Sequence, residues 1–283
     1  MTDVWTPLKL IAWTQGYLAR SGVDAPRLTA ELLLARALSC DRVRLYLDFD
    51  KPLGAAELAA FRDLVRRRAE GEPTAYLTGV KEFHGRAFHV DGRVLVPRPE
   101  TELLAEAALE ALPPGGAALD LCTGSGVLGI TLALERPGTR VVAADVSGDA
   151  VDVARANAAR LGASIDVRQG DLFEAVAAVP FPFDVVVANP PYVPSGELPR
   201  LSREIQREPR LALDGGPDGL SVIRRIVAGA PSRLAAGGTL LVEMHESHAG
   251  VVPRLCLEAG MVSAEARKDL AGLPRYAVAR AAG

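Results

Sequence analysis

Apolar residues follow two different patterns along this chain. The first part shows helical spacing, and in the later part short apolar runs alternate with amphipathic segments. Up to about residue 75 apolar residues recur at three- and four-residue spacing, as on one face of an amphipathic helix. We expect three helices here, one carrying Leu8 to Leu18, one beginning near Ala25-Pro26, and one carrying Leu58 to Val65. Residues 1–75 are therefore predicted to form a small helical domain.

Residues 76–97 show an extended pattern instead. Two apolar runs, Phe83–Val90 and Val94–Val96, flank Asp91-Gly92, a dipeptide typical of tight hairpin turns. We expect residues 76–97 to form a β-hairpin linker. Thr101 is then placed to cap the helix that follows.

From residue 98 onward, short apolar runs alternate with amphipathic windows such as Ala150–Leu161. The runs are candidate strands at 117–121, 140–144, 165–168, 184–188, 238–243, 261–266 and 275–280. Strands that alternate with helices predict an α/β fold, with a mainly parallel sheet covered by helices on both faces. Residues 98–283 are predicted to be this domain.

Composition excludes few function classes. The net charge is −3 and the pI about 5.9, so no global basic field favours nucleic acid. The three cysteines lie far apart and suggest no disulfide framework. Met1 to Lys9 lacks a basic leader, and no apolar run approaches membrane-spanning length, so we expect no membrane association and a cytoplasmic location.

The most informative motif is Asn189-Pro190-Pro191-Tyr192, directly after the apolar run Asp184–Ala188. The prolines must turn the chain at the carboxyl end of that strand, where open α/β sheets bind ligands. The Asn189 side-chain oxygen and the Pro190 carbonyl are acceptors, and Tyr192 offers a flat surface. These groups suit a planar NH2-bearing substrate, either a carboxamide or an exocyclic base amine.

A glycine-rich turn marks the candidate cofactor site. It follows the first strand of the α/β domain and precedes a helical run; its candidate ligand-binding residues are Asp120, Cys122, Thr123, Gly124, Ser125 and Gly126. Small residues allow a ligand close to the backbone, and a helix start offers free N–H groups. Asp145 ends the next strand, where nucleotide-binding folds place a ribose-binding carboxylate.

A third strand end carries Asp171 and Leu172, suited to an adenine amine and an adenine face. Acidic strand ends fit a ribose diol, an adenine amine and a cationic centre better than a pyrophosphate. They therefore favour S-adenosylmethionine and methyl transfer over hydride transfer. No metal is expected, because His245-Glu246-Ser247-His248 lacks the His-Glu-x-x-His spacing.

With these motifs in place, the chain resembles the PrmC/HemK family of protein-(glutamine-N5) methyltransferases. The similar segments, which span nearly the whole chain, are Ala75–Gly79, Phe83–Gly85, Val94–Glu102, Asp120–Gly126, Asn189–Tyr192, Asp214–Leu220 and Asp269–Tyr276. Asn-Pro-Pro-Tyr alone also occurs in DNA and RNA amino-methyltransferases, so the linker and the late segments narrow the choice. Cys122 and Met244–His248 depart from the family pattern.

The resemblance implies a class I, Rossmann-like methyltransferase domain after a helical substrate-recognition domain. It implies methyl transfer from S-adenosylmethionine, with S-adenosylhomocysteine as product, to the glutamine of the Gly-Gly-Gln motif in class 1 peptide chain release factors. This reaction supports translation termination. We expect no direct contact with nucleic acid, and a monomer.

In the expected mechanism, Asn189 and Pro190 each accept one N–H of the substrate amide, and Tyr192 packs against the amide plane. Three alternatives stay open. They are a DNA or RNA amino-methyltransferase acting on adenine N6 or cytosine N4, a methyltransferase of small molecules, and a cofactor-binding regulatory module without catalysis.

Overall fold

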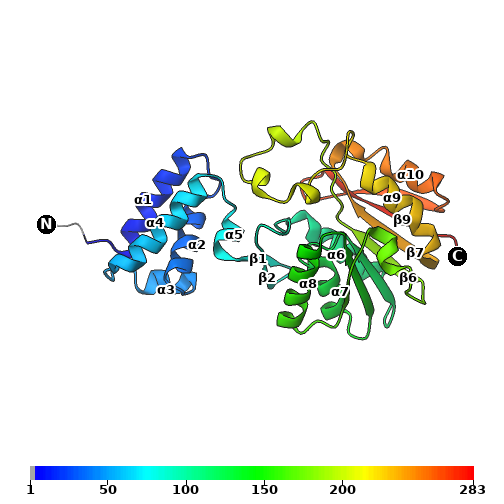
Figure 1. Cartoon of the computed structure of the whole chain (residues 1–283), viewed down its shortest axis with the longest axis horizontal. Helices are drawn as coiled ribbons and strands as arrows, with labels where there is room; N and C mark the ends of the chain where they lie inside the picture. Colours follow the sequence, from blue (N-terminus) through cyan, green and yellow to red (C-terminus); the bar gives the residue numbers. More distant parts are fainter. Residues whose placement is uncertain (1–3) are drawn as a thin grey trace. The chain divides into compact units, whose positions relative to one another are not determined.

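The computed structural model describes residues 4–283, so the first three residues of the expected helical domain lie outside it. The chain forms two compact units (Figure 1). One comprises the residues up to Val80 together with Ser202–Arg207, and the other comprises Lys81–Leu201 and Glu208–Gly283. The first unit thus extends past the residue-75 boundary predicted from the sequence, and the hairpin belongs mostly to the second.

The first unit is helical, as predicted. Its helices are α1 (Pro7–Arg20), α2 (Pro26–Ala37), α3 (Arg42–Leu47), α4 (Ala55–Ala69) and α5 (Thr74–Thr78). The three expected helices correspond to α1, α2 and α4. The sequence pattern missed α3 and α5 because six and five residues are too few to show a repeating apolar face. Asp41 begins α3 by accepting a hydrogen bond from the Arg44 backbone N–H at 2.7 Å.

A buried carboxylate lies within this helical unit. Glu31 of α2 is 2% exposed. It accepts hydrogen bonds from the Arg42 guanidinium and the Tyr46 hydroxyl, both at 2.5 Å, and from Arg27 at 3.2 Å. Burial opposes the charge, but these donors outweigh it and lower the pKa of Glu31. The interaction joins α2 to α3.

The hairpin has a different turn from the one expected. Its strands are β1 (Val80–Phe83) and β2 (Arg86–His89), so the turn lies at His84-Gly85. Both turn residues have positive φ, 48° and 71°, as a two-residue turn between twisted strands requires. The prediction that Asp91-Gly92 forms the hairpin turn was wrong. Asp91 instead accepts a hydrogen bond from the Arg93 backbone N–H in a separate turn, and Val94–Val96 is not a strand.

The helix after the hairpin also begins differently. Helix α6 (Glu100–Ala111) starts before Thr101, so Thr101 lies in its first turn and does not cap it. Its hydroxyl is free to bond elsewhere, and it donates to Glu243 at 2.7 Å.

The second unit is built on a seven-stranded sheet, which confirms the predicted α/β class. Its strands are β3 (Ala117–Leu121), β4 (Arg140–Asp145), β5 (Asp166–Gln169), β6 (Phe183–Ala188), β7 (Leu234–Glu243), β8 (Ser263–Lys268) and β9 (Pro274–Arg280). The order across the sheet is β5-β4-β3-β6-β7-β9-β8. Strand β9 is antiparallel to β7 and β8, and the other pairs are parallel.

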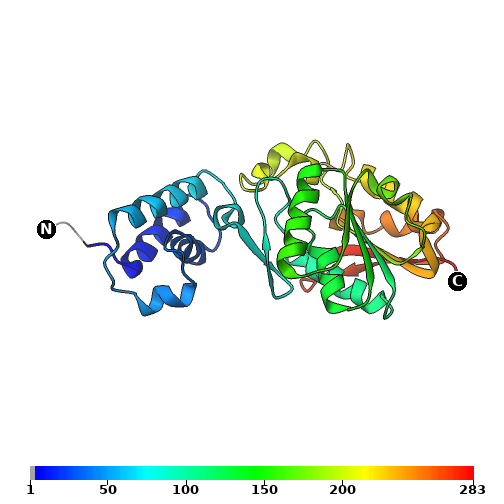
Figure 2. The same ribbon diagram turned by 60° about the horizontal axis from the view of Figure 1, so that its bottom comes forward.

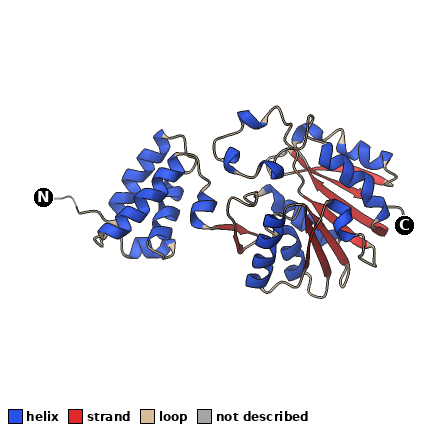
Figure 3. Ribbon diagram, viewed as in Figure 1, coloured by secondary structure: helices blue, strands red, loops and turns tan. Residues whose placement is uncertain are grey.

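Helices cover both faces of this sheet (Figures 2 and 3). One face packs against α6, α7 (Val127–Glu135) and α8 (Gly148–Leu161). The other packs against α9 (Ser221–Gly229) and α10 (Val252–Glu258). The residues of strand β6 alternate between these two faces. Val185 and Val187 belong to the core under α6, α7 and α8, and Val186 and Ala188 belong to the core under α9 and α10. The four residues of β6 that are buried on alternating faces, Val185–Ala188, are therefore all apolar.

Replacing Glu31 with Gln should weaken the helical unit. The change removes the charge and presents an NH2 group to donors, which costs about 1–3 kcal/mol when a buried acceptor is lost. Urea unfolding followed by tryptophan fluorescence would report on this unit alone, because both tryptophans, Trp5 and Trp13, lie in it. The control is Asp63→Asn, in an exposed ion pair with Arg66. It should change stability by less than about 1 kcal/mol. Equal effects of the two substitutions would contradict the importance of Glu31.

Candidate active site

The register of the sheet brings the predicted site residues together. Leu121 of β3 lies beside Ala188 of β6, and Ala188 lies beside Val242 of β7. The next residue along each strand is therefore Cys122, Asn189 or Glu243. These residues meet at the carboxyl edge of the parallel strands, where such sheets bind ligands.

The turn after β3 has a backbone conformation that favours small residues. Cys122, Gly124 and Gly126 have φ values of 58°, 55° and 86°. A Cβ atom on Gly126 would lie 2.8 Å from Ile130 Cδ1 and 3.3 Å from Ala154 Cβ, so α7 and α8 approach too closely for a side chain. Gly124 instead has no neighbour within 4 Å of such a Cβ atom, so the loop leaves open space above it.

Asp120 stabilises this turn from its buried side. It is fully buried, and one oxygen, Oδ2, accepts from the Thr123 hydroxyl at 2.5 Å and from the Gly129 N–H at 2.9 Å. The other oxygen, Oδ1, has no hydrogen-bond partner among residues 4–283. Burial raises the pKa of Asp120 to about 7. Asp120 therefore shapes the loop without reaching the ligand space.

Asp145 fixes the same turn from the side. Its two oxygens accept from the backbone N–H of Gly124 at 2.9 Å and of Ser147 at 3.0 Å. Burial raises its pKa, although the backbone donors oppose that shift. The strand end after β4 is thereby bound to the strand end after β3.

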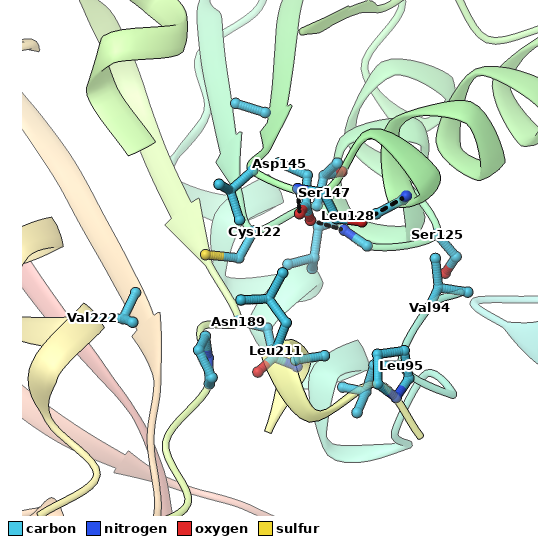
Figure 4. A pocket seen from close by; sticks show the side chains of 18 of the residues that line it. Val94, Leu95, Cys122, Ser125, Leu128, Asp145, Ser147, Asn189, Leu211 and Val222 are labelled. Atoms are coloured by element: carbon cyan, nitrogen blue, oxygen red, sulfur yellow. Dashed lines mark hydrogen bonds between the residues drawn. The ribbon is translucent and has the colours of Figure 1, made fainter. Parts of the chain in front are cut away.

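These strand ends surround a cavity of about 310 Å³ within the second unit (Figure 4). This volume lies at the lower end of the range for small-molecule sites. Of the residues predicted from the sequence, the cavity is lined by Cys122, Thr123, Gly124, Ser125, Asp145, Asp171, Leu172, Asn189 and Pro191. The structure thus brings the predicted cofactor loop and the substrate motif to one cavity.

Four predicted residues do not line this cavity. Asp120 is buried beneath the turn, and Gly126 lies within the turn against Ile130 and Ala154. Pro190 is buried, and the Tyr192 ring packs against the core on the α9 and α10 face. Burial raises the pKa of Tyr192, so its hydroxyl stays protonated.

Other lining residues were missed because nothing in their local sequence indicates a ligand. Arg93, Val94, Leu95, Pro97 and Thr101 come from the linker and the start of α6. Pro209, Leu211 and Ala212 come from the segment between β6 and α9, and Val222 and Arg225 come from α9. Arg225 pairs with Asp171 at 2.8 Å, so the acidic strand end has a cationic neighbour.

Asn189 is held by polar contacts at the edge of the cavity. Its Nδ2 donates to Thr101 Oγ1 at 3.1 Å. Thr101 in turn donates to Glu243 Oε2 at 2.7 Å, and the Tyr192 hydroxyl donates to Glu243 Oε1 at 3.4 Å. Within residues 4–283, no hydrogen bond engages Asn189 Oδ1 or the Pro190 carbonyl.

The His245–His248 segment has a structural role. His245 caps a short 3-10 helix, and His248 Nε2 lies 3.1 Å from the Asp218 carbonyl. In the part of the chain that the structure describes, no three His, Cys, Asp or Glu residues are grouped to hold a metal ion. Over the same residues, no helix is both long and apolar enough to cross a membrane.

Comparisons with known proteins identify the family of this chain. The PrmC N-terminal domain matches residues 9–79, and the methyltransferase small domain matches residues 99–216. A release factor glutamine methyltransferase of Geobacter sulfurreducens is 43% identical over 274 residues, which cover 96% of each chain. This chain belongs to that family. The Chlorobaculum tepidum relative of the same name is 46% identical and covers 89% of this chain and 90% of its own.

Solved structures support the fold of the second unit. A methyltransferase from Pyrococcus furiosus has a TM-score of 0.54 at 19% identity, covering 71% of this chain and 91% of its own. The Thermus thermophilus 16S rRNA N2 G1207 methyltransferase, solved with AdoMet and guanosine, has a TM-score of 0.53 at 20% identity. It covers 71% of this chain and 49% of its own. The class I methyltransferase fold expected from the sequence is confirmed.

Proposed function

We propose that this chain methylates the N5 amide nitrogen of the glutamine in the Gly-Gly-Gln motif of class 1 peptide chain release factors. The observation that carries the proposal is one cavity that contains both the glycine-rich turn and Asn189. Family membership indicates the substrate, and the geometry supplies an acceptor for an amide.

The cavity suits S-adenosylmethionine as the methyl donor. Gly124 leaves open space above the turn, Asp145 faces the cavity for the ribose hydroxyls, and Leu172 and Val146 offer apolar walls for a base. Asp171 remains our candidate for the adenine amine. When bound, the cofactor supplies an electrophilic methyl group and becomes S-adenosylhomocysteine.

The protein's contribution to the reaction is to orient a poor nucleophile. The lone pair of an amide nitrogen is delocalised into its carbonyl. If Asn189 Oδ1 and the Pro190 carbonyl each accept one N–H of the substrate, both hydrogens are fixed, and the nitrogen faces its reaction partner. The same oxygens stabilise positive charge as it develops on the nitrogen. The nitrogen becomes acidic as the new C–N bond forms, so no strong base is needed beforehand.

The helical unit would contribute to binding of the release factor. Between α1 and α4 it contains a groove of about 280 Å³, lined by Trp5, Trp13, Tyr17, Phe61 and Arg62, among others. Of these, Trp13 and Arg62 are exposed, and aromatic and arginine side chains are enriched in protein interfaces. We further propose that the chain acts as a monomer.

A direct experiment tests the whole proposal. The protein is incubated with labelled S-adenosylmethionine and a purified release factor, and the label is located by mass spectrometry. We expect it on the glutamine of the Gly-Gly-Gln motif, and no label on a release factor with alanine at that position. Transfer to DNA or RNA instead would favour the nucleic-acid alternative.

Asn189→Ala should lower the turnover rate by about 100-fold or more, the scale for losing one preorganised polar contact to a transition state. Cofactor affinity, measured by calorimetry, should change much less. Full methylation activity in this variant would rule out the proposed role of Asn189.

Asp145→Ala should instead weaken cofactor binding first, because it removes the proposed ribose contact and the bond to the Gly124 N–H. The matched control is Asp149→Ala, which removes the same charge from an exposed position in the first turn of α8. Calorimetric titration of both variants would test the assignment. Unchanged affinity in the Asp145 variant would show that the ribose assignment is wrong.

A further inference from the structure

Glu243 and Thr101 form a buried polar relay behind Asn189. Both side chains are 1% exposed. They come from the end of β7 and the first turn of α6, which lie 142 residues apart in sequence. Burying a carboxylate is costly unless its oxygens find donors. Here both oxygens have one, from Thr101 and from Tyr192.

The number of donatable protons in this relay determines which group donates each of its hydrogen bonds. An ionised carboxylate only accepts, so the single Thr101 proton points toward Glu243. Toward Asn189, Thr101 Oγ1 can then only accept. Asn189 must therefore turn its NH2 group toward Thr101, as the 3.1 Å contact shows. Its carbonyl oxygen, Oδ1, is left to serve as an acceptor.

From this geometry we infer that Glu243 and Thr101 are positioning residues, which set the orientation of the Asn189 amide so that Oδ1 accepts a substrate N–H. An asparagine side chain turned by 180° would present two donors to a substrate that also offers donors. No hydrogen bond could then form. The inference rests on the proposed function of Asn189, and it assigns a task to two residues that need not touch the substrate amide.

The ionisation state of Glu243 makes this direction depend on pH. Burial raises its pKa to about 7, while the hydrogen bonds from Thr101 and Tyr192 oppose that rise. The charged groups that face it are Glu100 of α6 and Arg275 of β9. Arg275 is paired with Asp269 at 2.9 Å. A protonated Glu243 becomes a donor itself, so it no longer requires the Thr101 proton.

The direct test compares Thr101→Val with Thr101→Ser. Valine has nearly the same shape but no hydroxyl, so Asn189 loses its anchor. We expect the turnover rate to fall about tenfold or more, the scale for leaving a buried polar group without its partner. Serine keeps the hydroxyl and should restore the rate to within about threefold. The thermal midpoint and cofactor affinity of both variants check that the fold is intact.

A double substitution separates positioning from other roles. If Thr101 acts through Asn189, then Thr101→Val should cause no further loss in the Asn189→Ala background. Multiplicative losses would overturn the inference, as would wild-type turnover of Thr101→Val while Asn189→Ala is impaired. Full activity of Asn189→Ala would instead defeat the proposed function itself.

Nuclear magnetic resonance supplies a readout without turnover. The side-chain amide signals of Asn189 are identified by their loss in Asn189→Ala. Their hydrogen exchange should be slow in the native protein and in Thr101→Ser, and faster in Thr101→Val. Equal exchange in all three would contradict the anchoring of this amide.

The pH dependence of turnover in Glu243→Gln tests whether ionised Glu243 determines the direction of these hydrogen bonds. In the native protein, turnover should rise as pH increases through about 7, because Glu243 loses its proton there. Glutamine can present an NH2 group to Thr101 and does not titrate. The variant should therefore be slower at pH 8, and its profile should lack this rise. A Gln variant with the native rate and pH profile would overturn the role of Glu243.

Discussion

The alignment of β6 between β3 and β7 is the constraint on which the site depends. In a parallel sheet the strands end at the same edge, so this register decides which side chains become neighbours. It places Asn189 between Cys122 of the loop and Glu243 of the next strand. A shift of one residue would exchange the faces of β6 and move Asn189 away from both.

Most of the sheet could be predicted from the sequence, because its central strands contain continuous apolar runs. Val185–Val187, for example, indicates a strand buried on both faces, and the sheet core contains it. Asp145 and Cys122–Ser125 could also be predicted, since motif position alone brings them to the cavity. The sequence was sufficient to predict those features whose conformation is determined by neighbouring residues in the chain.

The remainder depended on contacts between distant parts of the chain. Thr101 follows prolines and precedes a glutamate, so its local sequence suggested a helix cap. Its partner, Glu243, could not be identified without the sheet order. The hairpin turn was misplaced because Asp91-Gly92 is the stronger turn signal, whereas His84 adopts positive φ without being glycine. Pro190 and Tyr192 directly follow Asn189 in the sequence, but the direction of their side chains follows from packing, and neither lines the cavity.

The two outermost strands of the sheet, β5 and β8, bear on how the protein behaves in a crowded solution. Strand β5 carries Asp166 and Arg168, and β8 carries Glu265, Arg267 and Lys268. A strand from another molecule that tried to extend the sheet would meet these charges beside the unpaired backbone groups. Charged edge strands oppose the addition of a strand from another molecule, so neither edge of the sheet favours aggregation.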